Sequence, residues 1–234
     1  MLLKENKVAI QVMNTKGLVK NTGFKALIVG ASGTGKTSIF KSTGKTIIIS
    51  SEGSELTLND YDVDIIKVSS TTELREAYTY VKDNTDKYDT VGIDSISDIG
   101  AMIVAELKAD PYYGDMKNSM PMWMKFTEII TLVAKSFRDL QNINVIILAL
   151  PESVKSGFEE KIMPLIPAKK AQAMLQSYYD LVLLIRVNSD GDREFICQPT
   201  EEFDAKDRSD KLNSVEPYSK ELGIKPLIDK IINK

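Results

Sequence analysis

A glycine-rich stretch, GASGTGKT at residues 30–37, combines the residue types that bind a chain of phosphates. It matches the pattern G-x-x-x-x-G-K-[ST] between an apolar stretch and a helical pattern, and a chance match in this length is on the order of one in a hundred. Its glycines let backbone N–H groups turn inward around phosphate oxygens; Lys36 would reach the β and γ phosphates, and the Thr37 hydroxyl would bind Mg²⁺. The alternative is a Gly-rich turn that binds nothing. We expect nucleotide contacts from the whole loop, at Gly30, Ala31, Ser32, Gly33, Thr34, Gly35, Lys36, Thr37 and Ser38.

Two carboxylates follow apolar stretches that would end at one edge of a sheet. Asp94 ends TVGID at residues 90–94, and a phosphate loop of this kind needs such a carboxylate for its metal ion. The alternative for Asp94 is a cap of the next helix, since Ser95 follows it. Glu52 comes just after the apolar stretch 46–50, where a carboxylate in line with the γ phosphate could deprotonate water. From spacing alone, an ordinary solvated Glu52 is an equally good interpretation.

The composition excludes several kinds of site. The 234 residues include no His and a single Cys, Cys197, so Ser-His-Asp and Cys-His catalysis, zinc ribbons and an intramolecular disulfide are ruled out. Lys and Arg number 30 against 33 Asp and Glu, and the formal charge of −3 gives no global basic field toward nucleic acid or a membrane. The longest apolar run, 145–151, is too short to cross a bilayer, and the first residues lack the apolar core of a signal peptide. We therefore expect a soluble cytoplasmic protein without a membrane partner.

Short apolar stretches alternate with helical patterns, which predicts an α/β fold with a mostly parallel twisted sheet flanked by helices. Helices are expected over 72–84 and 122–140, where apolar side chains recur three and four residues apart. The turn residues 188–192 would join the last two strands as an antiparallel hairpin. Residues 109–121 and 151–168 are expected to be irregular. The expected strands are residues 7–13, 24–30, 46–50, 64–68, 90–94, 144–150, 180–187 and 193–198.

A single large domain suits the length of the chain and its hydrophobic content of 43%. We expect this domain to span residues 1–212, with residues 1–23 as an N-terminal strand or extension. Residues 213–234 would form a C-terminal amphipathic helix that serves as a cap, a tether or a docking site.

The order GASGTGKT, SSEGS and GIDS resembles the RecA superfamily of ATPases over residues 24–210. Within it, the sequence is most similar to small phage-encoded proteins described as RecA-like ATP-binding single-strand annealing recombinases, whose phosphate-loop helix is also short. The resemblance implies a RecA-like core, ATP and Mg²⁺ as ligands, and Glu52 as the catalytic base. The residues themselves do not separate ATP from GTP, and a phage-encoded protein would act in the host cytoplasm.

The segment AKDRSDK at residues 205–211 places two cations, Lys206 and Arg208, on one side of an extended chain. Relatives in the superfamily carry a Lys-x-Arg pair that reaches the nucleotide site of the neighbouring subunit. The resemblance therefore implies that Lys206 and Arg208 contact a γ phosphate across an interface, within a ring or a filament of identical subunits. The alternative is a solvated cluster in which the cations pair with the interleaved acids Asp204, Asp207 and Asp210.

Two further segments correspond to the loops with which RecA-type proteins bind single-stranded DNA. Aromatic rings could stack on bases and lysines could contact phosphates, although three Glu residues dilute the charge of the second segment. Trp123 begins a helical pattern and is expected in the core rather than on such a surface. The candidate DNA-binding residues are Tyr112, Tyr113, Lys117, Lys155, Lys161, Lys169 and Lys170.

Two functions remain open from the sequence. The first is a Mg²⁺-dependent, DNA-stimulated ATPase that coats single strands and promotes annealing or homologous recombination. The second is a nucleotide-switched loader or adaptor that acts on a replication protein, such as a helicase or a single-strand-binding protein, rather than directly on DNA. The charge balance favours the second function slightly, whereas the pattern of Glu52 with Lys206 and Arg208 favours the first.

Overall fold

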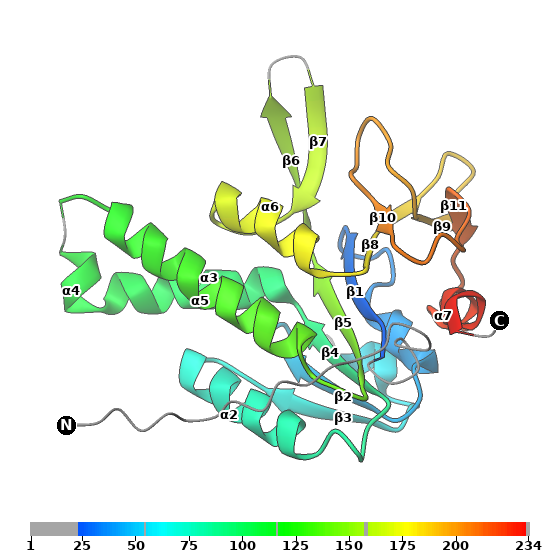
Figure 1. Ribbon diagram of the computed structural model, residues 1–234, viewed down its shortest axis with the longest axis horizontal. Coiled ribbons are helices and arrows are strands. Elements are labelled where there is room, and N and C mark those ends of the chain that lie inside the picture. The colour runs from blue at the N-terminus through cyan, green and yellow to red at the C-terminus, as the bar shows by residue number, and fades with distance from the viewer. Residues whose placement is uncertain (1–22, 54, 116, 157–158, 233–234) are drawn as a thin grey trace, which may run out of the picture.

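A computed structural model describes residues 23–53, 55–115, 117–156 and 159–232 (Figure 1). The expected strand at 7–13 and nearly all of the expected extension 1–23 lie outside these residues. In the described chain one large sheet contains nine strands: β1 Lys25–Gly30, β2 Thr46–Ser50, β3 Val63–Lys67, β4 Thr90–Asp94, β5 Asn144–Ala149, β8 Leu181–Val187, β9 Arg193–Ile196, β10 Lys206–Asp207 and β11 Val215–Pro217.

The other elements are helices and a separate two-stranded sheet. That sheet pairs β6 (Pro151–Ser156) with β7 (Glu159–Pro164). The helical segments are η1 Thr37–Ser42, η2 Glu55–Leu58, α2 Thr71–Asp83, α3 Ile96–Ala109, α4 Pro111–Gly114, α5 Met120–Arg138, α6 Lys169–Tyr178 and α7 Lys225–Ile232, of which η1 and η2 are 3-10 turns.

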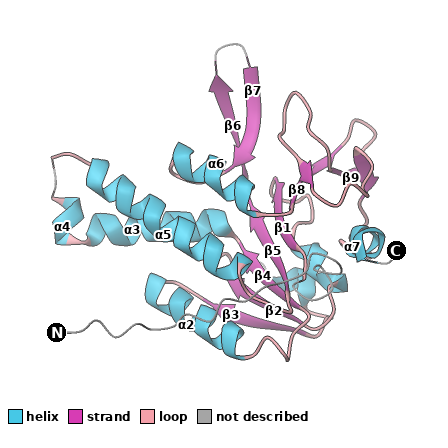
Figure 2. Ribbon diagram, viewed as in Figure 1, coloured by secondary structure: helices cyan, strands magenta, loops and turns pink. Residues whose placement is uncertain are grey.

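The main sheet is mostly parallel, as the sequence predicts (Figure 2). Its path runs β11-β9-β8-β1-β5-β4-β2-β3, with parallel pairing from β8 to β3 and antiparallel pairing of β9, β10 and β11. Because β1, β2 and β4 are parallel, their carboxyl ends at Gly30, Ser50 and Asp94 lie at one edge. The expected hairpin across 188–192 is present over the second half of β8, from Leu184 to Val187.

Alternate side chains of the apolar strands pack on opposite faces of the sheet, which explains why these stretches are apolar throughout. Leu27 and Val29 of β1 belong to a cluster with buried side chains of α2, α3, α5 and α6. Ala26 and Ile28 belong to a second cluster, with Ile39 of η1 and with buried residues of α7. The sheet therefore carries the long helices on one face and the short phosphate-loop turn with α7 on the other (Figure 1).

Two stretches expected to be irregular contain regular structure. Residues 109–121 include α4 and the start of α5. Residues 151–156 and 159–164 pair as the β6–β7 hairpin, which projects from the body of the molecule (Figure 1). The hairpin was missed because its strands are rich in charged residues and lack the apolar run that marks a buried strand.

The C-terminal stretch also differs from the expected single helix over 213–234. Residues 215–217 form β11, which pairs with β9, and the helix α7 begins only at Lys225. Gly223 between them has a φ of +53°, a left-handed backbone conformation that interrupts a helix. Buried α7 side chains belong to the same cluster as β1 residues. The division of the chain at residue 212 remains a prediction.

The packing of α5 on the sheet gives a first prediction about stability. Phe126 is fully buried, with its ring 6.0 Å from that of Trp123. Phe126→Ala should lower the free energy of unfolding by about 3–5 kcal/mol, because it removes contacts and leaves a cavity. Urea unfolding measures this change. The matched control on the same helix is Leu132→Ala, whose side chain is 63% exposed, and it should cost less than about 0.5 kcal/mol. Equal losses in the two variants would contradict this packing.

Candidate functional site

The glycine-rich loop joins β1 to the 3-10 turn η1, and its backbone adopts conformations that require glycine. Gly33 and Gly35 have φ angles of +81° and +101°, where a side chain would be strained. The turn that follows is only six residues long, in agreement with the short helix that the sequence indicates. The glycines at these two positions therefore allow the backbone conformation that a phosphate-binding loop requires.

Lys36 is the central cation of this loop. Its side chain is buried, and its Nζ donates a hydrogen bond to the Ala31 carbonyl oxygen at 3.1 Å, so the amine lies back across the loop. Burial lowers the pKa of Lys36, while the negative charges of Glu52, Asp94 and Asp98 act in the opposite direction. The amine therefore lies across the loop, near carboxylates whose charges favour its protonated form.

Thr37 and Asp94 meet at the base of the same site. The Thr37 hydroxyl donates to Asp94 Oδ2 at 2.8 Å, and Asp94 is 1% exposed at the end of β4. The helix-cap interpretation of Asp94 is wrong, because Ser95 caps α3 by accepting from the Asp98 amide. A hydroxyl beside a buried carboxylate supplies the oxygen ligands that Mg²⁺ uses together with phosphate oxygens. The residues present therefore fit a magnesium ion shared with a nucleotide.

Glu52 lies at the same edge, two residues beyond the end of β2. The Ser51 amide donates to the Asp94 carbonyl at 3.0 Å, which ties the ends of β2 and β4 together. Partial burial raises the pKa of Glu52, and the charges of Asp94 and Asp98 raise it further, against the opposing effect of Lys36. Its side chain is nevertheless exposed at the mouth of a pocket. A carboxylate with a raised pKa at this position is suited to accept a proton.

These residues surround one pocket of about 390 Å³, within the range of small-molecule sites. The sequence-predicted Ser32, Gly33, Gly35, Lys36, Thr37, Ser38 and Glu52 line it together with Thr57 and Lys220. The last two were missed by the sequence reasoning. Thr57 lies in an unremarkable polar stretch, and Lys220 lies almost two hundred residues from the loop, so neither carries a local signal.

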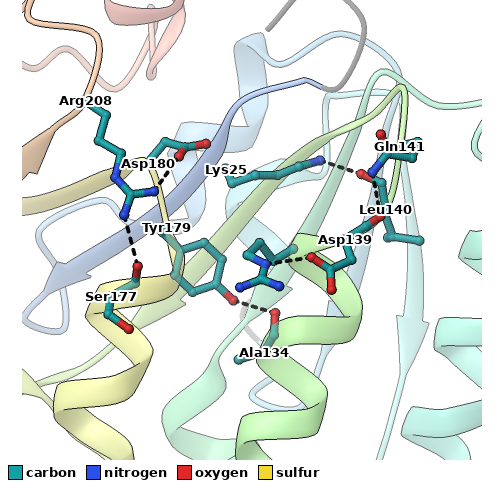
Figure 3. Close-up of polar contacts among 10 residues, drawn as sticks. Lys25, Ala134, Asp139, Leu140, Gln141, Ser177, Tyr179, Asp180 and Arg208 are labelled. Atoms are coloured by element: carbon teal, nitrogen blue, oxygen red, sulfur yellow. Dashed lines mark hydrogen bonds and ion pairs between the residues drawn. The ribbon is translucent and has the colours of Figure 1, made fainter. Parts of the chain in front are cut away.

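Lys206 and Arg208 do not line this pocket. Figure 3 shows Arg208 directed toward Asp180 and Ser177. Lys206 Nζ donates to the Gln176 carbonyl at 2.7 Å, and Arg208 donates to Asp180 at 3.1 Å and to the Ser177 carbonyl at 3.4 Å. They thus contact the C-terminal end of α6 and the residue before β8. Because β10 pairs with the start of β8, they belong to the edge of the sheet opposite the phosphate loop. Their action on a neighbouring subunit remains a prediction.

Among the described residues, neither Lys206 nor Arg208 pairs with the interleaved acids Asp204, Asp207 and Asp210. Asp204 accepts from Lys161, and Asp207 accepts from backbone amides of the following turn. Arg208 instead pairs with Asp180, and both side chains are about half exposed. This ion pair therefore contributes little to stability, and Arg208 can leave Asp180 for another anion at a small cost in free energy.

The candidate DNA-binding residues are not gathered at one place. Tyr112 is 66% exposed and stacks edge-on against Tyr113 at the α4 end of the molecule, whereas Lys155 and Lys161 lie on the β6–β7 hairpin at a different end (Figure 1). Lys155 pairs with Glu160 at 3.8 Å, and Lys161 pairs with Asp204. Lys117, Lys169 and Lys170 are exposed. Trp123 packs against the core, as expected.

A mostly parallel sheet carries the glycine loop, Lys36, Thr37 and the buried Asp94 at one edge. This arrangement defines a P-loop nucleotide-binding domain. The chain belongs to the AAA domain family, whose model matches residues 22–209. Its fold is similar to that of the KaiC-like protein PH0186 from the hyperthermophilic archaeon Pyrococcus horikoshii OT3, with a TM-score of 0.50, 14% identity, and coverage of 85% of this chain and 86% of that chain. No curated protein matches the sequence.

The family match supports a P-loop ATPase domain, and the likeness to the solved structure supports the fold alone. The finer resemblance to phage annealing recombinases remains a prediction. Among the described helices, none has both the length and the apolar character that a membrane span requires.

Proposed function

We propose that this protein is a Mg²⁺-dependent ATPase that assembles head to tail and couples ATP hydrolysis to binding of single-stranded DNA. The single observation that supports the hydrolytic part is the hydrogen bond to the buried Asp94 from Thr37, which lines the pocket together with Lys36 and Glu52. ATP rather than GTP is proposed from the family, because phosphate contacts are common to both nucleotides.

Binding would use the loop amides and Lys36, which leaves its Ala31 partner to contact the β and γ phosphates. Thr37 and Asp94 would hold Mg²⁺, which supplies positive charge to the phosphate oxygens when bound. The exposed Glu52 at the mouth of the pocket would orient a water molecule and accept its proton as that water attacks the γ phosphorus. ADP and inorganic phosphate are then the products.

Charge stabilisation from a neighbouring subunit would complete the site. No cation of the β10 segment lines the pocket of its own chain, and the Arg208–Asp180 pair is exposed enough to rearrange. A head-to-tail contact that brings Arg208 and Lys206 to the next γ phosphate produces a ring or a filament. Arg208 is the better γ-phosphate ligand of the two, since its planar guanidinium can donate twice.

Mixed subunits test this arrangement. Arg208→Ala and Lys36→Ala proteins should each be inactive alone, but a mixture should recover ATPase activity, because Lys36→Ala subunits supply Arg208 to intact phosphate loops. Phosphate release measures the recovery, and mixing Lys36→Ala with a Lys36→Ala, Arg208→Ala double variant is the control. A mixture as inactive as its components, under conditions where wild-type subunits associate, would show that Arg208 does not act in trans.

Binding of single strands is proposed from the resemblance and from the exposed Tyr112 and surface lysines. Labelled oligonucleotide should be retained on filters with the protein and ATP at low salt, and retention should fall steeply as salt rises. Tyr112→Ala should weaken retention by about five- to a hundredfold, because stacking on one base contributes roughly 1–3 kcal/mol. Failure to retain the oligonucleotide at low salt, with ATP present, would remove DNA from the proposal.

The second candidate function is a nucleotide-switched loader or adaptor for a replication protein. The observation that favours it is the neutralisation of hairpin lysines, since Lys155 and Lys161 both pair with carboxylates. In that case the β6–β7 hairpin would contact protein rather than DNA. ATPase activity without oligonucleotide retention, and without stimulation by single strands, is the result expected for this function.

A further inference from the structure

The C-terminal segment folds back across the phosphate loop, although it is far from it in sequence. On one side, the Tyr218 hydroxyl donates to the Gly35 carbonyl at 2.6 Å. On the other side, the Ser42 hydroxyl donates to the Leu222 carbonyl at 2.6 Å. The chain between these two contacts, which includes Lys220, is therefore attached to the glycine-rich loop at one end and to η1 at the other.

The first attachment, at Tyr218, is supported by further contacts. Tyr218 is buried, its ring is 4.9 Å from that of Phe195, and its amide donates to the Arg193 carbonyl at 2.9 Å. The Arg193 side chain in turn donates to the Thr34 carbonyl at 3.1 Å. Hydrogen bonds thus connect β9, the segment around Tyr218 and the phosphate loop to one another.

The second attachment is a close backbone contact. A Cβ at Gly223 would lie 2.7 Å from the Ile39 carbonyl oxygen, so only glycine lets the chain approach η1 this closely. Just beyond it, Ile224 and Leu227 are buried in the same cluster as Ile39. The segment that precedes α7 is consequently seated on η1 by apolar burial as well as by hydrogen bonds.

Lys220 is placed on the pocket by these attachments. It lines the pocket with Lys36, and its Cε lies 3.2 Å from the position that a Cβ on Gly35 would occupy. Within the described chain its amine has neither a hydrogen bond nor an ion pair, and its charge only helps to lower the pKa of the exposed Glu221. Lys36 and Lys220 are the two cations among the described residues that line this pocket.

We propose that Lys220 is a phosphate-binding residue of its own chain's nucleotide site, and that residues 218–223 form part of that site. The inference rests on the proposed ATP binding and adds to it a cation from the C-terminal segment. A second amine adds positive charge to a pocket that already contains Lys36 and the carboxylate Glu52. An amine held at this place can donate a charge-assisted hydrogen bond to the phosphate chain.

Equilibrium binding of a fluorescent ATP analogue with Mg²⁺ tests the proposal. Lys220→Met should weaken binding about ten- to a hundredfold, as expected for the loss of a hydrogen bond to a charged group, and Lys220→Arg should restore most of the affinity. Lys225→Met is the matched control from the same segment, since Lys225 is exposed and pairs with Asp229. It should bind within twofold of wild type. Thermal unfolding of each variant verifies that it is folded.

A second measurement needs no variant. Lysine acetylation of the wild-type protein, followed by mass spectrometry, should show Lys220 protected by ATP and Mg²⁺ while Lys225 reacts equally with and without them. Affinity of Lys220→Met within twofold of wild type, or Lys220 labelling unchanged by ATP, would overturn the proposal while leaving ATP binding intact. Absence of nucleotide binding by the wild-type protein would instead overturn the proposed function, and this inference with it.

Discussion

Glu52→Gln should bind ATP about as tightly as the wild-type protein but turn it over roughly a hundred- to ten-thousandfold more slowly, the contribution expected of a general base. Gln keeps the size and polarity of the side chain at the pocket mouth but cannot accept a proton at pH 7. Steady-state phosphate release and equilibrium ATP binding, measured on the same preparation, separate the two effects. Turnover close to that of wild type would reject Glu52 as the base.

The pH dependence of the reaction provides an independent check on Glu52. Burial, with Asp94 and Asp98 nearby, raises the pKa of Glu52, and only the deprotonated carboxylate can act as a base. The value of kcat/KM should therefore fall as the pH decreases through that raised pKa, at a higher pH than for an ordinary glutamate. Glu52→Gln should retain its residual rate without this acid limb. A wild-type profile that is flat until the protein unfolds would contradict the assignment.

Lys36→Ala should lower kcat/KM for ATP by at least about a hundredfold, because a positioned cation is lost where charge develops on the phosphates. The substitution removes the amine that lies across the loop and leaves the backbone amides in place. Phosphate release at limiting ATP measures the loss. Lys41→Ala is a suitable control, since Lys41 lies in η1, the turn that follows Lys36, but does not line the pocket. It should change the rate by less than about twofold. Similar rates for the two variants would contradict the role of Lys36.

The parallel sheet and the edge that carries the site follow from the sequence for a clear reason. Strands 25–30 and 90–94 are buried on both faces, so their central residues, 26–29 and 91–93, are apolar, and their short length favours strands over helices. Once these strands are parallel, Gly30, Asp94 and the residues after Ser50 must share an edge. The proximity of Lys36, Thr37, Asp94 and Glu52 could therefore be predicted without coordinates.

Other features depend on contacts between distant segments and could not be predicted in this way. The β6–β7 hairpin is stabilised by cross-strand pairing of mostly polar residues, which leaves no hydrophobic period to detect. Lys206 contacts Gln176, and Lys220 lies close to Gly35. Both contacts depend on where the C-terminal part of the chain packs against the rest of the domain. Composition and spacing do not indicate such contacts between distant segments. The position of Lys220 at the pocket is therefore seen only in the structure.

The central claim is that the loop amides, Lys36, Thr37 and Asp94 together hold ATP with Mg²⁺. Calorimetric titration of ATP into the wild-type protein and into Asp94→Asn, each with and without Mg²⁺, tests it most directly. We predict one ATP per wild-type chain, bound more tightly with Mg²⁺ than without, and little or no effect of Mg²⁺ on the affinity of Asp94→Asn. A folded wild-type protein that binds no ATP with Mg²⁺ present would contradict the claim.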